Sequence, residues 1–417
     1  MSSFSFTRRN RKAATAVATF AAAALVLSGC AATDNGGAAG GELTLKIGTA
    51  LPQTGSLAYL GPPEEAGVAL AIKEINEADK GIQIEVELGD SGDLDNKTYE
   101  TTIPRLLAAD VNAIVGAASS SVSLAFIDQV VGAGVLQISP ANTSPKLTDY
   151  ADEGLYFRTA PSDLLQGEVL GNLMSADGHE TAALIVLNDA YGTGLRDATK
   201  ASFEAAGGTI VAEPVFNPGD TNFSSQISEA LAESPDAIVL ITFDEAKTIV
   251  PALVSQFPAE NLYFVDGNLA DYSADFAEGT LEGAKGTAPG LDPDTIMDFL
   301  DKMDANWVAE GNDALTSYLY GPESYDAVVL LALAALAAGS VEGVDMAAKM
   351  QEVSGGSGEG TKCFTFAECA DIINDGGIAD YDGISSPVTF DEKGDPTQGN
   401  ILVSIYGKDN KITAVKE

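Results

Sequence analysis

The sequence has few of the residues on which metal sites and nucleophilic active sites depend. Its 417 residues contain one histidine (His179), one tryptophan and three cysteines. A His-Glu-x-x-His zinc motif and a Ser-His-Asp triad both need histidine, and a Gly-x-Ser-x-Gly nucleophile elbow is missing as well. The sequence therefore offers little support for an exported esterase or peptidase. A hydrolase that uses a carboxylate pair stays open in so acidic a chain.

Basic residues are also scarce. The chain has 22 Lys and Arg against 61 Asp and Glu, a net charge of −39. Cleavage before Cys30 would remove four basic residues and no acidic one, which leaves 18 against 61 and a net charge of −43. Such a surface repels phosphates, which excludes nucleic acid as a partner. We interpret the acidity as a means of solubility, including adaptation to salt.

The N-terminal apolar run, residues 13–27, falls short of the roughly 20 residues that a membrane-spanning helix needs. It follows a cationic start and ends in Leu27-Ser28-Gly29-Cys30, the three-part layout of a secretory signal. That ending resembles a bacterial lipobox, in which the cysteine is acylated and becomes the new N-terminus. We predict a lipoprotein signal peptide at residues 1–29 and lipidation at Cys30. The Arg8-Arg9 pair leaves both Sec and twin-arginine export open.

Residues 30–42 are small, polar and Gly-rich, as in a flexible linker. The linker would hold a folded body off the membrane surface, with the ordered part starting near Leu43. The other two cysteines, Cys363 and Cys369, form an even pair in an exported chain, and an oxidising compartment favours a disulfide between them. Two free thiols are the alternative.

Strand-like and helix-like patterns alternate along residues 43–265. Strands are predicted at 43–49, 82–88, 113–115 and 136–139, and after Pro161 at 181–187, 209–215, 237–241 and 262–265. Helices are predicted between them at 64–78, 98–109, 121–133, 193–206, 222–233 and 245–256. Repeated strand–helix units of this length imply parallel sheets with right-handed crossovers.

The C-terminal third has a mixed pattern. Helices are predicted at 295–307, 325–338 and 346–353, and hairpin-like strands at 388–390, 401–406 and 412–415. We therefore predict an α/β fold of two doubly wound parallel-sheet domains, with a hinge and an interdomain ligand cleft. Domain 1 would comprise residues 43–160 plus 287–387, and domain 2 residues 161–286 plus 388–417. The chain would cross between them near Ala160, Gly286 and Pro387.

Several short passages carry a family resemblance through their order and spacing. They are residues 47–52, 116–121, 139–145 and 188–192, and Gly394-Asp395. Together they resemble the branched-chain amino acid (Leu/Ile/Val) type of type I periplasmic binding protein, the extracellular receptors of ABC importers. The resemblance covers the whole chain after the linker.

This resemblance implies a function. The protein would be a monomer without catalytic activity or cofactor, anchored by lipid at the extracellular face of the cytoplasmic membrane. It would capture a small polar solute, an amino acid or a related amide or carboxylate, and deliver it to the ABC permease subunits. A ligand-sensing lipoprotein that signals to a membrane receptor is the alternative.

Three serines follow the strand at 113–115 and open a helix: Ser119, Ser120 and Ser121. Hydroxyls and free backbone N–H groups at a helix N-terminus suit a carboxylate, although N-capping by one serine would also explain the pattern. The resemblance places the principal carboxylate-binding serine at Ser120. It also implies that the Ala141 carbonyl and Thr143 hold the amino acid head group, where a plain loop is the alternative.

The resemblance assigns the remaining candidates to the walls of the cleft. Tyr191 would cover the ligand on closure unless it is a buried structural tyrosine, and Phe243 stands where the family has a tyrosine. Asn268 falls where amino acid binders carry a glutamate for the ligand ammonium, which puts an α-amino acid in doubt unless Asp266 or Asp244 substitutes. An aromatic wall is expected near Tyr59 and Leu60, displaced by one residue.

Overall fold

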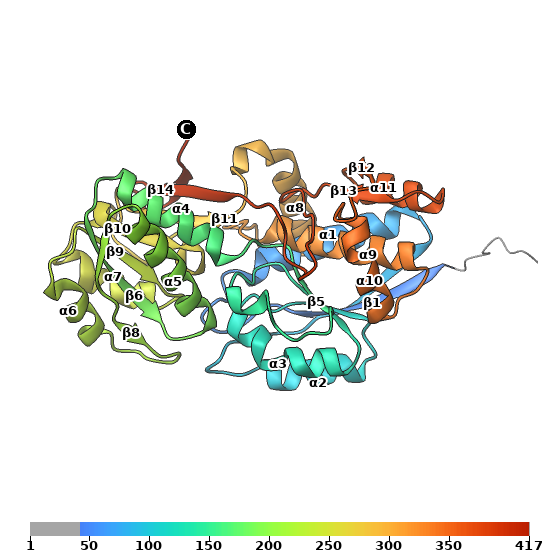
Figure 1. Cartoon of the computed structure of the whole chain (residues 1–417), viewed down its shortest axis with the longest axis horizontal. Coiled ribbons are helices and arrows are strands. Elements are labelled where there is room, and N and C mark those ends of the chain that lie inside the picture. The colour runs from blue at the N-terminus through green and yellow to red at the C-terminus, as the bar shows by residue number, and fades with distance from the viewer. Residues whose placement is uncertain (1–41, 417) are drawn as a thin grey trace, which may run out of the picture. The chain divides into compact units, whose positions relative to one another are not determined.

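Five parallel strands form the first sheet. In the computed structural model, which describes residues 42–416, the sheet contains β1 (Leu43–Ala50), β2 (Ile82–Glu87), β3 (Ala113–Gly116), β4 (Leu136–Ser139) and β5 (Tyr156–Arg158) (Figure 1). The spatial order is β2-β1-β3-β4-β5. The residues of β3, β4 and β5 are all buried, as expected for strands that are covered on both faces.

Seven helices belong with this sheet, and together they make up what we call the N-lobe. They are α1 (Gly61–Ala78), α2 (Tyr99–Ala108), α3 (Ser120–Gly132), α8 (Met297–Ala309), α9 (Gly321–Ala338), α10 (Gly343–Val353) and α11 (Phe366–Asn374). Among the described residues, α9 is the one helix long and apolar enough to cross a membrane, but 83% of it is buried inside the protein. It is the central core helix of the N-lobe, which confirms the helix predicted at 325–338.

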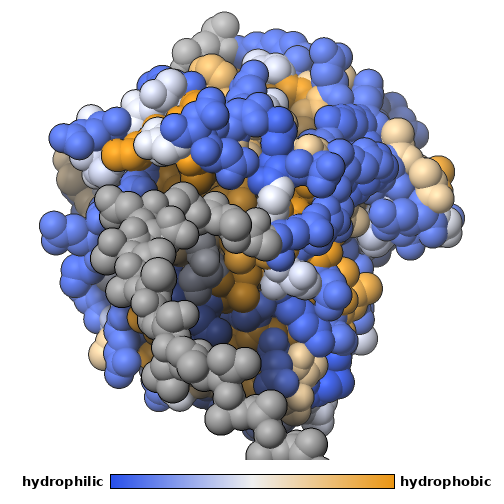
Figure 2. All heavy atoms as spheres, turned by 90° about the vertical axis from the view of Figure 1, so that its right-hand side faces the viewer, coloured by the Kyte–Doolittle hydropathy of each residue, from blue (hydrophilic) through white to orange (hydrophobic). Residues whose placement is uncertain are grey.

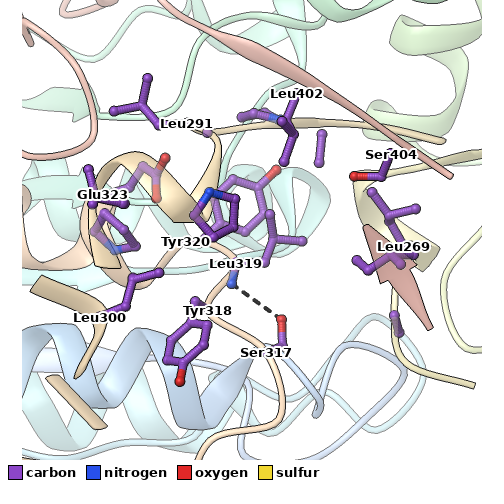
Figure 3. A pocket seen from close by; sticks show the side chains of 18 of the residues that line it. Leu269, Leu291, Leu300, Ser317, Tyr318, Leu319, Tyr320, Glu323, Leu402 and Ser404 are labelled. Atoms are coloured by element: carbon purple, nitrogen blue, oxygen red, sulfur yellow. Dashed lines mark hydrogen bonds between the residues drawn. The ribbon is translucent and has the colours of Figure 1, made fainter. Parts of the chain in front are cut away.

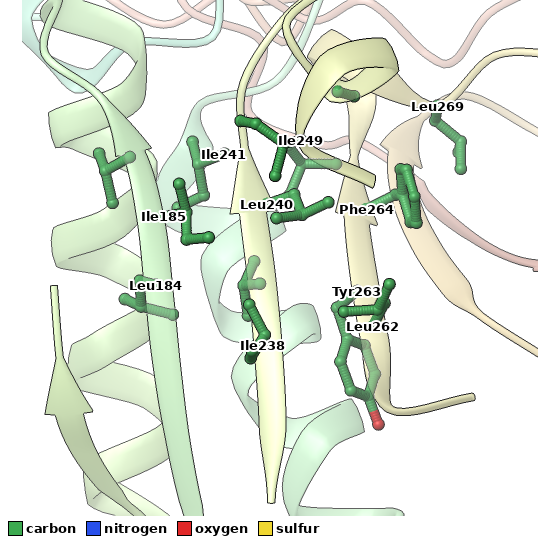
Figure 4. Close-up of a cluster of buried hydrophobic side chains, with 14 of the residues drawn as sticks. Leu184, Ile185, Ile238, Leu240, Ile241, Ile249, Leu262, Tyr263, Phe264 and Leu269 are labelled. Carbon is green, nitrogen blue, oxygen red and sulfur yellow. The ribbon is translucent and has the colours of Figure 1, made fainter. Parts of the chain in front are cut away.

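The second sheet defines what we call the C-lobe. Its strands are β6 (Thr181–Leu187), β7 (Thr209–Ala212), β8 (Val215–Phe216), β9 (Ala237–Ile241), β10 (Leu262–Val265), β11 (Lys285–Pro289), β14 (Ile401–Tyr406) and β15 (Ile412–Ala414). The spatial order is β15-β14-β11-β10-β9-β6-β7, and β8 also pairs with β6. Strand β14 is antiparallel to both of its neighbours. Helices α4 (Asp163–Ala176), α5 (Ala190–Ala205), α6 (Ser224–Ala232) and α7 (Ala246–Val254) complete this lobe. Figure 4 shows the apolar side chains that β6, β9 and β10 bury between sheet and helices.

A small element carries the two C-terminal cysteines. Strands β12 (Thr361–Cys363) and β13 (Ala379–Tyr381) pair in parallel beside α11. Cys363 and Cys369 are joined by a disulfide with their Cα atoms 5.4 Å apart, which confirms the predicted pairing. Cys30, the signal peptide and the linker up to residue 41 lie outside the described residues.

The N-lobe end of the molecule presents a largely polar surface. Figure 2 looks onto this end and shows hydrophilic side chains over much of the visible face, with apolar side chains between them in smaller groups. Phe364, beside the disulfide, is among the exposed large apolar residues of this lobe. Scattered exposed apolar residues of this kind are normal on protein surfaces.

The α/β fold class is confirmed, and the differences from the predicted elements have local causes. The strand expected at 209–215 is divided into β7 and β8 by Pro214, which cannot donate to a ladder. Residues 388–390 form one isolated bridge, from Phe390 to Pro396, rather than a strand. Short β5 and helix α4 were not predicted.

The chain passes between the sheets at three places. It leaves β5 after Arg158 and enters α4 at Asp163. Gly286 lies inside β11, paired with both β10 and β14, so the second passage follows Pro289. Val388 and Phe390 still pack in the N-lobe core, so the third passage lies between Phe390 and β14, beyond Pro387. The passages after β11 and before β14 thus fall slightly later than predicted.

Candidate ligand-binding site

A small cavity lies where the carboxyl ends of the two sheets meet. The N-lobe order reverses between β1 and β3, and the C-lobe order between β6 and β9, which are the switch points where open α/β sheets bind ligands. The cavity has a volume of about 10 Å³. Its wall is formed by residues from both lobes: Leu57, Leu60, Ala118, Ser119, Ser120, Ala141, Tyr191, Phe243, Asp266, Gly267 and Tyr320.

Most of the predicted site residues meet at this central cavity. Those that line it are Leu60, Ser119, Ser120, Ala141, Tyr191 and Phe243. Tyr59 and Asn268 instead line an adjoining cavity of about 90 Å³, together with Phe243 and Asp244. Thr143 is buried and lines neither of these two cavities.

The three serines have different roles. Ser119 is the N-cap of α3, and its hydroxyl accepts from Val122 N. The hydroxyl of Ser121 accepts from the backbone N–H of Ala190 at 2.8 Å, a bond between the lobes. N-capping therefore accounts for one serine of the three.

The Ser120 hydroxyl is set up as a donor. Its oxygen accepts from Thr143 N at 3.3 Å and from Ser144 N at 3.2 Å. Because both lone pairs are engaged, the hydroxyl proton is the group left for another partner. Ser120 begins α3, whose N-terminus favours negative charge. The N-lobe wall of the cavity therefore suits a carboxylate.

Asp266 brings a carboxylate to the opposite wall, and among the described residues it is the one acidic side chain that lines this cavity. It accepts from Tyr191 Oη at 2.6 Å, Tyr320 Oη at 2.7 Å and Gln166 Nε2 at 3.0 Å. Burial raises the pKa of Asp266, and these three donors, together with the backbone N–H of Gly267, oppose the rise. The carboxylate thus brings acceptor oxygens to this wall of the cavity.

Aromatic side chains complete the C-lobe wall. Tyr191 stacks on Phe243 with ring centroids 5.3 Å apart and an interplanar angle of 14°. Gly267 lies against both rings, because a Cβ there would stand 2.9 Å from Tyr191 Oη and 2.8 Å from Phe243 Cδ1. Only glycine lets the chain approach this closely.

Tyr320 was not among the predicted residues. It precedes α9 with a φ of 62°, in the left-handed region, and its hydroxyl reaches Asp266 from the other lobe. A bulky residue in this region carries strain, which is common at ligand sites. No sequence pattern marked Tyr320, because its role depends on a contact between lobes.

Asn268 is engaged within the C-lobe. Its Oδ1 accepts from Val265 N at 2.9 Å, while its Nδ2 donates to Leu240 O at 2.7 Å and to Thr242 Oγ1 at 2.8 Å. The amide thus ties the end of β10 to the end of β9.

Tyr59 and Thr143 both make contacts between lobes. Tyr59 Oη donates to Asp266 O at 2.9 Å. The Thr143 carbonyl accepts from Asp163 N at 2.7 Å. Both hydrogen bonds therefore join the two lobes.

The approach to the central cavity is acidic. A neighbouring cavity of about 200 Å³ shares Ser119 and Phe243 with it. Five acidic residues from both lobes line this approach: Asp93, Asp95, Asp189, Asp220 and Glu245. An approach of this kind repels free anions and attracts molecules with a positive group.

Two α/β lobes with a shared cavity at their switch points are the architecture of a two-lobed binding protein. A family model described as periplasmic binding protein matches residues 44–376. The chain is 30% identical over 328 residues to the Leu/Ile/Val-binding protein homolog 1 of Brucella suis, covering 76% of this chain and 84% of that protein. The chain belongs to the periplasmic binding protein family, as the sequence resemblance predicted, and is a binding protein rather than an enzyme.

Solved structures share the fold. A leucine binding protein from Thermotoga maritima superposes with a TM-score of 0.72 at 21% identity, covering 89% of this chain and 98% of that one. The branched-chain amino acid transporter substrate binding protein LivJ from Streptococcus pneumoniae, in complex with isoleucine, gives a TM-score of 0.71 at 23% identity, with 90% and 100% covered.

Proposed function

We propose that this protein is the solute receptor of an ABC importer and that its solute is an α-amino acid with an apolar side chain. The observation that carries the proposal is the pairing of Asp266 with the N-terminus of α3 across one small cavity. A zwitterion presents a carboxylate and an ammonium group a short distance apart, which these two walls complement. The relative named as a Leu/Ile/Val-binding protein homolog supports the same class of solute.

The head group would be held by charge-assisted hydrogen bonds. The ligand carboxylate would accept from the Ser120 hydroxyl and from N–H groups of the first turn of α3. The ligand ammonium would donate to Asp266 and to the carbonyl of Ala141, which also lines the cavity. Asp266 thus takes the part that the family resemblance gave to a glutamate at position 268.

The remaining wall suits an apolar side chain. Leu57 and Leu60 face the stacked pair of Tyr191 and Phe243, and none of the four brings a charge. The acidic approach disfavours a carboxylic acid without an ammonium group.

Solute entry would require the lobes to separate. A cavity of about 10 Å³ holds roughly one water molecule, far less than an amino acid. The bonds from Tyr59 and Tyr320 to Asp266 and from Ala190 to Ser121 join the lobes, so opening breaks them and closure remakes them. Hinge closure of this type commits a ligand to its site.

Calorimetry with leucine, isoleucine, valine and alanine tests the solute class. We expect at least one of the first three to bind, and 4-methylpentanoate, which is leucine without its ammonium group, to bind at least tenfold more weakly. Ser120→Ala and Asp266→Asn should each lower amino acid affinity roughly ten- to a hundredfold, because each removes a charge-assisted bond worth about 1.5–3 kcal/mol.

Asp244→Asn is the matched control, because Asp244 lines the adjoining cavity and not the central one. It should leave amino acid affinity within twofold. Equal binding of leucine and 4-methylpentanoate, or wild-type affinity in Asp266→Asn, would show that the ligand ammonium group does not bind to Asp266.

Membrane anchoring is a separate part of the proposal. We propose that Cys30, which lies outside the described residues, carries the lipid that tethers the receptor at the outer face of the cytoplasmic membrane, next to its permease. Cys30→Ala should abolish incorporation of a fatty-acid analogue in living cells and leave an uncleaved precursor. Cys369→Ala, which breaks the disulfide, should still be labelled. Continued labelling of Cys30→Ala would contradict the assignment.

A further inference from the structure

A second and much larger pocket lies between the lobes and shares Tyr320 with the central cavity. Its volume is about 410 Å³, within the range of small-molecule sites. C-lobe residues on β11, β14 and β15 form one side, and N-lobe residues on α8, the segment before α9 and the start of α9 form the other. We call it the interlobe pocket. Figure 3 shows its leucine side chains: Leu269, Leu291, Leu300, Leu319 and Leu402.

One buried carboxylate faces this apolar space. Glu323, in the first turn of α9, is 4% exposed and lines the pocket. Apart from its own backbone N–H, no group among the described residues donates a hydrogen bond to its carboxylate. Burial, followed by the nearby carboxylate of Asp326, raises the pKa of Glu323 to about 8. A carboxyl group without a cationic partner is costly to bury, and a positively charged ligand would supply that partner.

The other charged residues at the pocket already pair with each other. Lys411 Nζ lies 3.0 Å from Asp271 Oδ2, so the lysine of the wall is neutralised. Within the part of the chain that the structure describes, Glu323 is therefore the one charge-bearing group of this wall that lacks a charged partner. The protein as a whole carries a net charge of −39, which draws organic cations toward it.

We propose that the interlobe pocket is a second binding site, for an organic cation with an apolar body whose ammonium group pairs with Glu323. The leucine walls would take the apolar body. Tyr320 lines both this pocket and the central cavity, so an occupant here would touch the same side chain that contacts Asp266. The site is distinct from the proposed amino acid site, since it shares neither Ser120 nor Asp266 with it.

Three probes that share a phenylethyl body test the charge preference: 2-phenylethylamine, 2-phenylethanol and 3-phenylpropanoate, which are cationic, neutral and anionic. Calorimetry at pH 7 should show the amine binding at least tenfold more tightly than either of the others. Glu323→Gln should reduce amine affinity at least tenfold, to the level of the alcohol. Glu310→Gln, at the exposed end of α8, is the matched control and should bind the amine as wild type does.

A variant of the wall tests the location without touching any charge. Leu402→Trp would place an indole in the pocket and should weaken binding of the amine at least tenfold while amino acid binding persists. The proposal is overturned if the three probes bind equally or not at all, or if Glu323→Gln binds the amine as wild type does. It is also overturned if Asp266→Asn, and not Glu323→Gln, loses the amine, because the amine would then occupy the central cavity.

Discussion

Asp395→Asn is expected to lower the free energy of unfolding by about 3–5 kcal/mol, because it leaves a buried guanidinium without its counter-charge. Arg158 is fully buried in β5, and its Nε and Nη2 donate to the two carboxylate oxygens of Asp395, each at 2.6 Å. Two parallel bonds of this kind form the strongest ion-pair geometry available to arginine. Equilibrium unfolding in urea at pH 7 measures the loss.

The same variant should weaken solute binding, because Arg158 also holds a binding loop. Its Nη1 donates to the carbonyls of Asn142 and Ser144, and its Nη2 to Thr148 Oγ1. The loop that follows β4 carries Ala141 and Thr143 into the interlobe region. Asp395 lies in the passage that returns the chain to the C-lobe, so this ion pair fixes the loop to that passage.

An exposed ion pair is the matched control. Lys408 and Glu278 lie 3.1 Å apart with side chains 67% and 69% exposed. Exposed pairs contribute about 0–1 kcal/mol, so Glu278→Gln should change the free energy of unfolding by no more than that. Equal effects of Asp395→Asn and Glu278→Gln would mean that the buried pair contributes no more to stability than an exposed one.

The sheets could be predicted from the sequence because each strand carries its own signal. Apolar and polar residues alternate over 43–49 and 82–88, and 237–241 and 262–265 are short apolar runs bounded by polar residues. Each strand can therefore be predicted to within a few positions. The position of Ser120 at the start of a helix could be predicted for the same reason, since it lies four residues after such a strand ends. Strand β5 was not predicted because it has only three residues and ends in a buried arginine.

The C-lobe residues at the central cavity could not be predicted in the same way. Asp266 and Asn268 belong to one short 3₁₀ helix, in which successive residues rotate by about 120°. They therefore face different directions, Asp266 toward the central cavity and Asn268 toward the ends of β9 and β10. A family pattern locates the turn but not the face that each residue presents. Tyr320 depends on tertiary contact alone.

A buried glutamate, Glu64, is expected to make the free energy of unfolding depend strongly on pH. Glu64 in α1 is 0% exposed, and among the described residues neither of its carboxylate oxygens has a hydrogen-bond partner. Burial, and then the carboxylates of Glu65 and Glu323, raise the pKa of Glu64 well above its usual range. Helices α1 and α9 touch here through glycines, since a Cβ on Gly67 would stand 2.1 Å from Gly321 O, and the Glu64 side chain is closed off from solvent.

A raised carboxyl pKa makes the folded state hold a proton that the unfolded chain releases. The stability contributed by protonated Glu64 is complete below the unfolded pKa of about 4.3 and is lost as pH rises toward the folded pKa. For one group the loss approaches about 1.4 kcal/mol per pH unit. Glu64→Gln removes this dependence while keeping the shape of the neutral side chain. The variant and wild type should therefore unfold alike near pH 4.5, and the variant should be more stable by up to about 3 kcal/mol near pH 7.

Urea unfolding at half-unit steps from pH 4.5 to 8 measures the difference directly. Wild type should lose stability steadily over this range, since Glu323, with its pKa raised to about 8, contributes in the same direction. Glu229→Gln, on the exposed face of α6, controls for the change in net charge and should run parallel to wild type. If Glu64→Gln also ran parallel, Glu64 would be charged in the folded protein, and the dry contact between α1 and α9 would have to admit a cation or water to accommodate it.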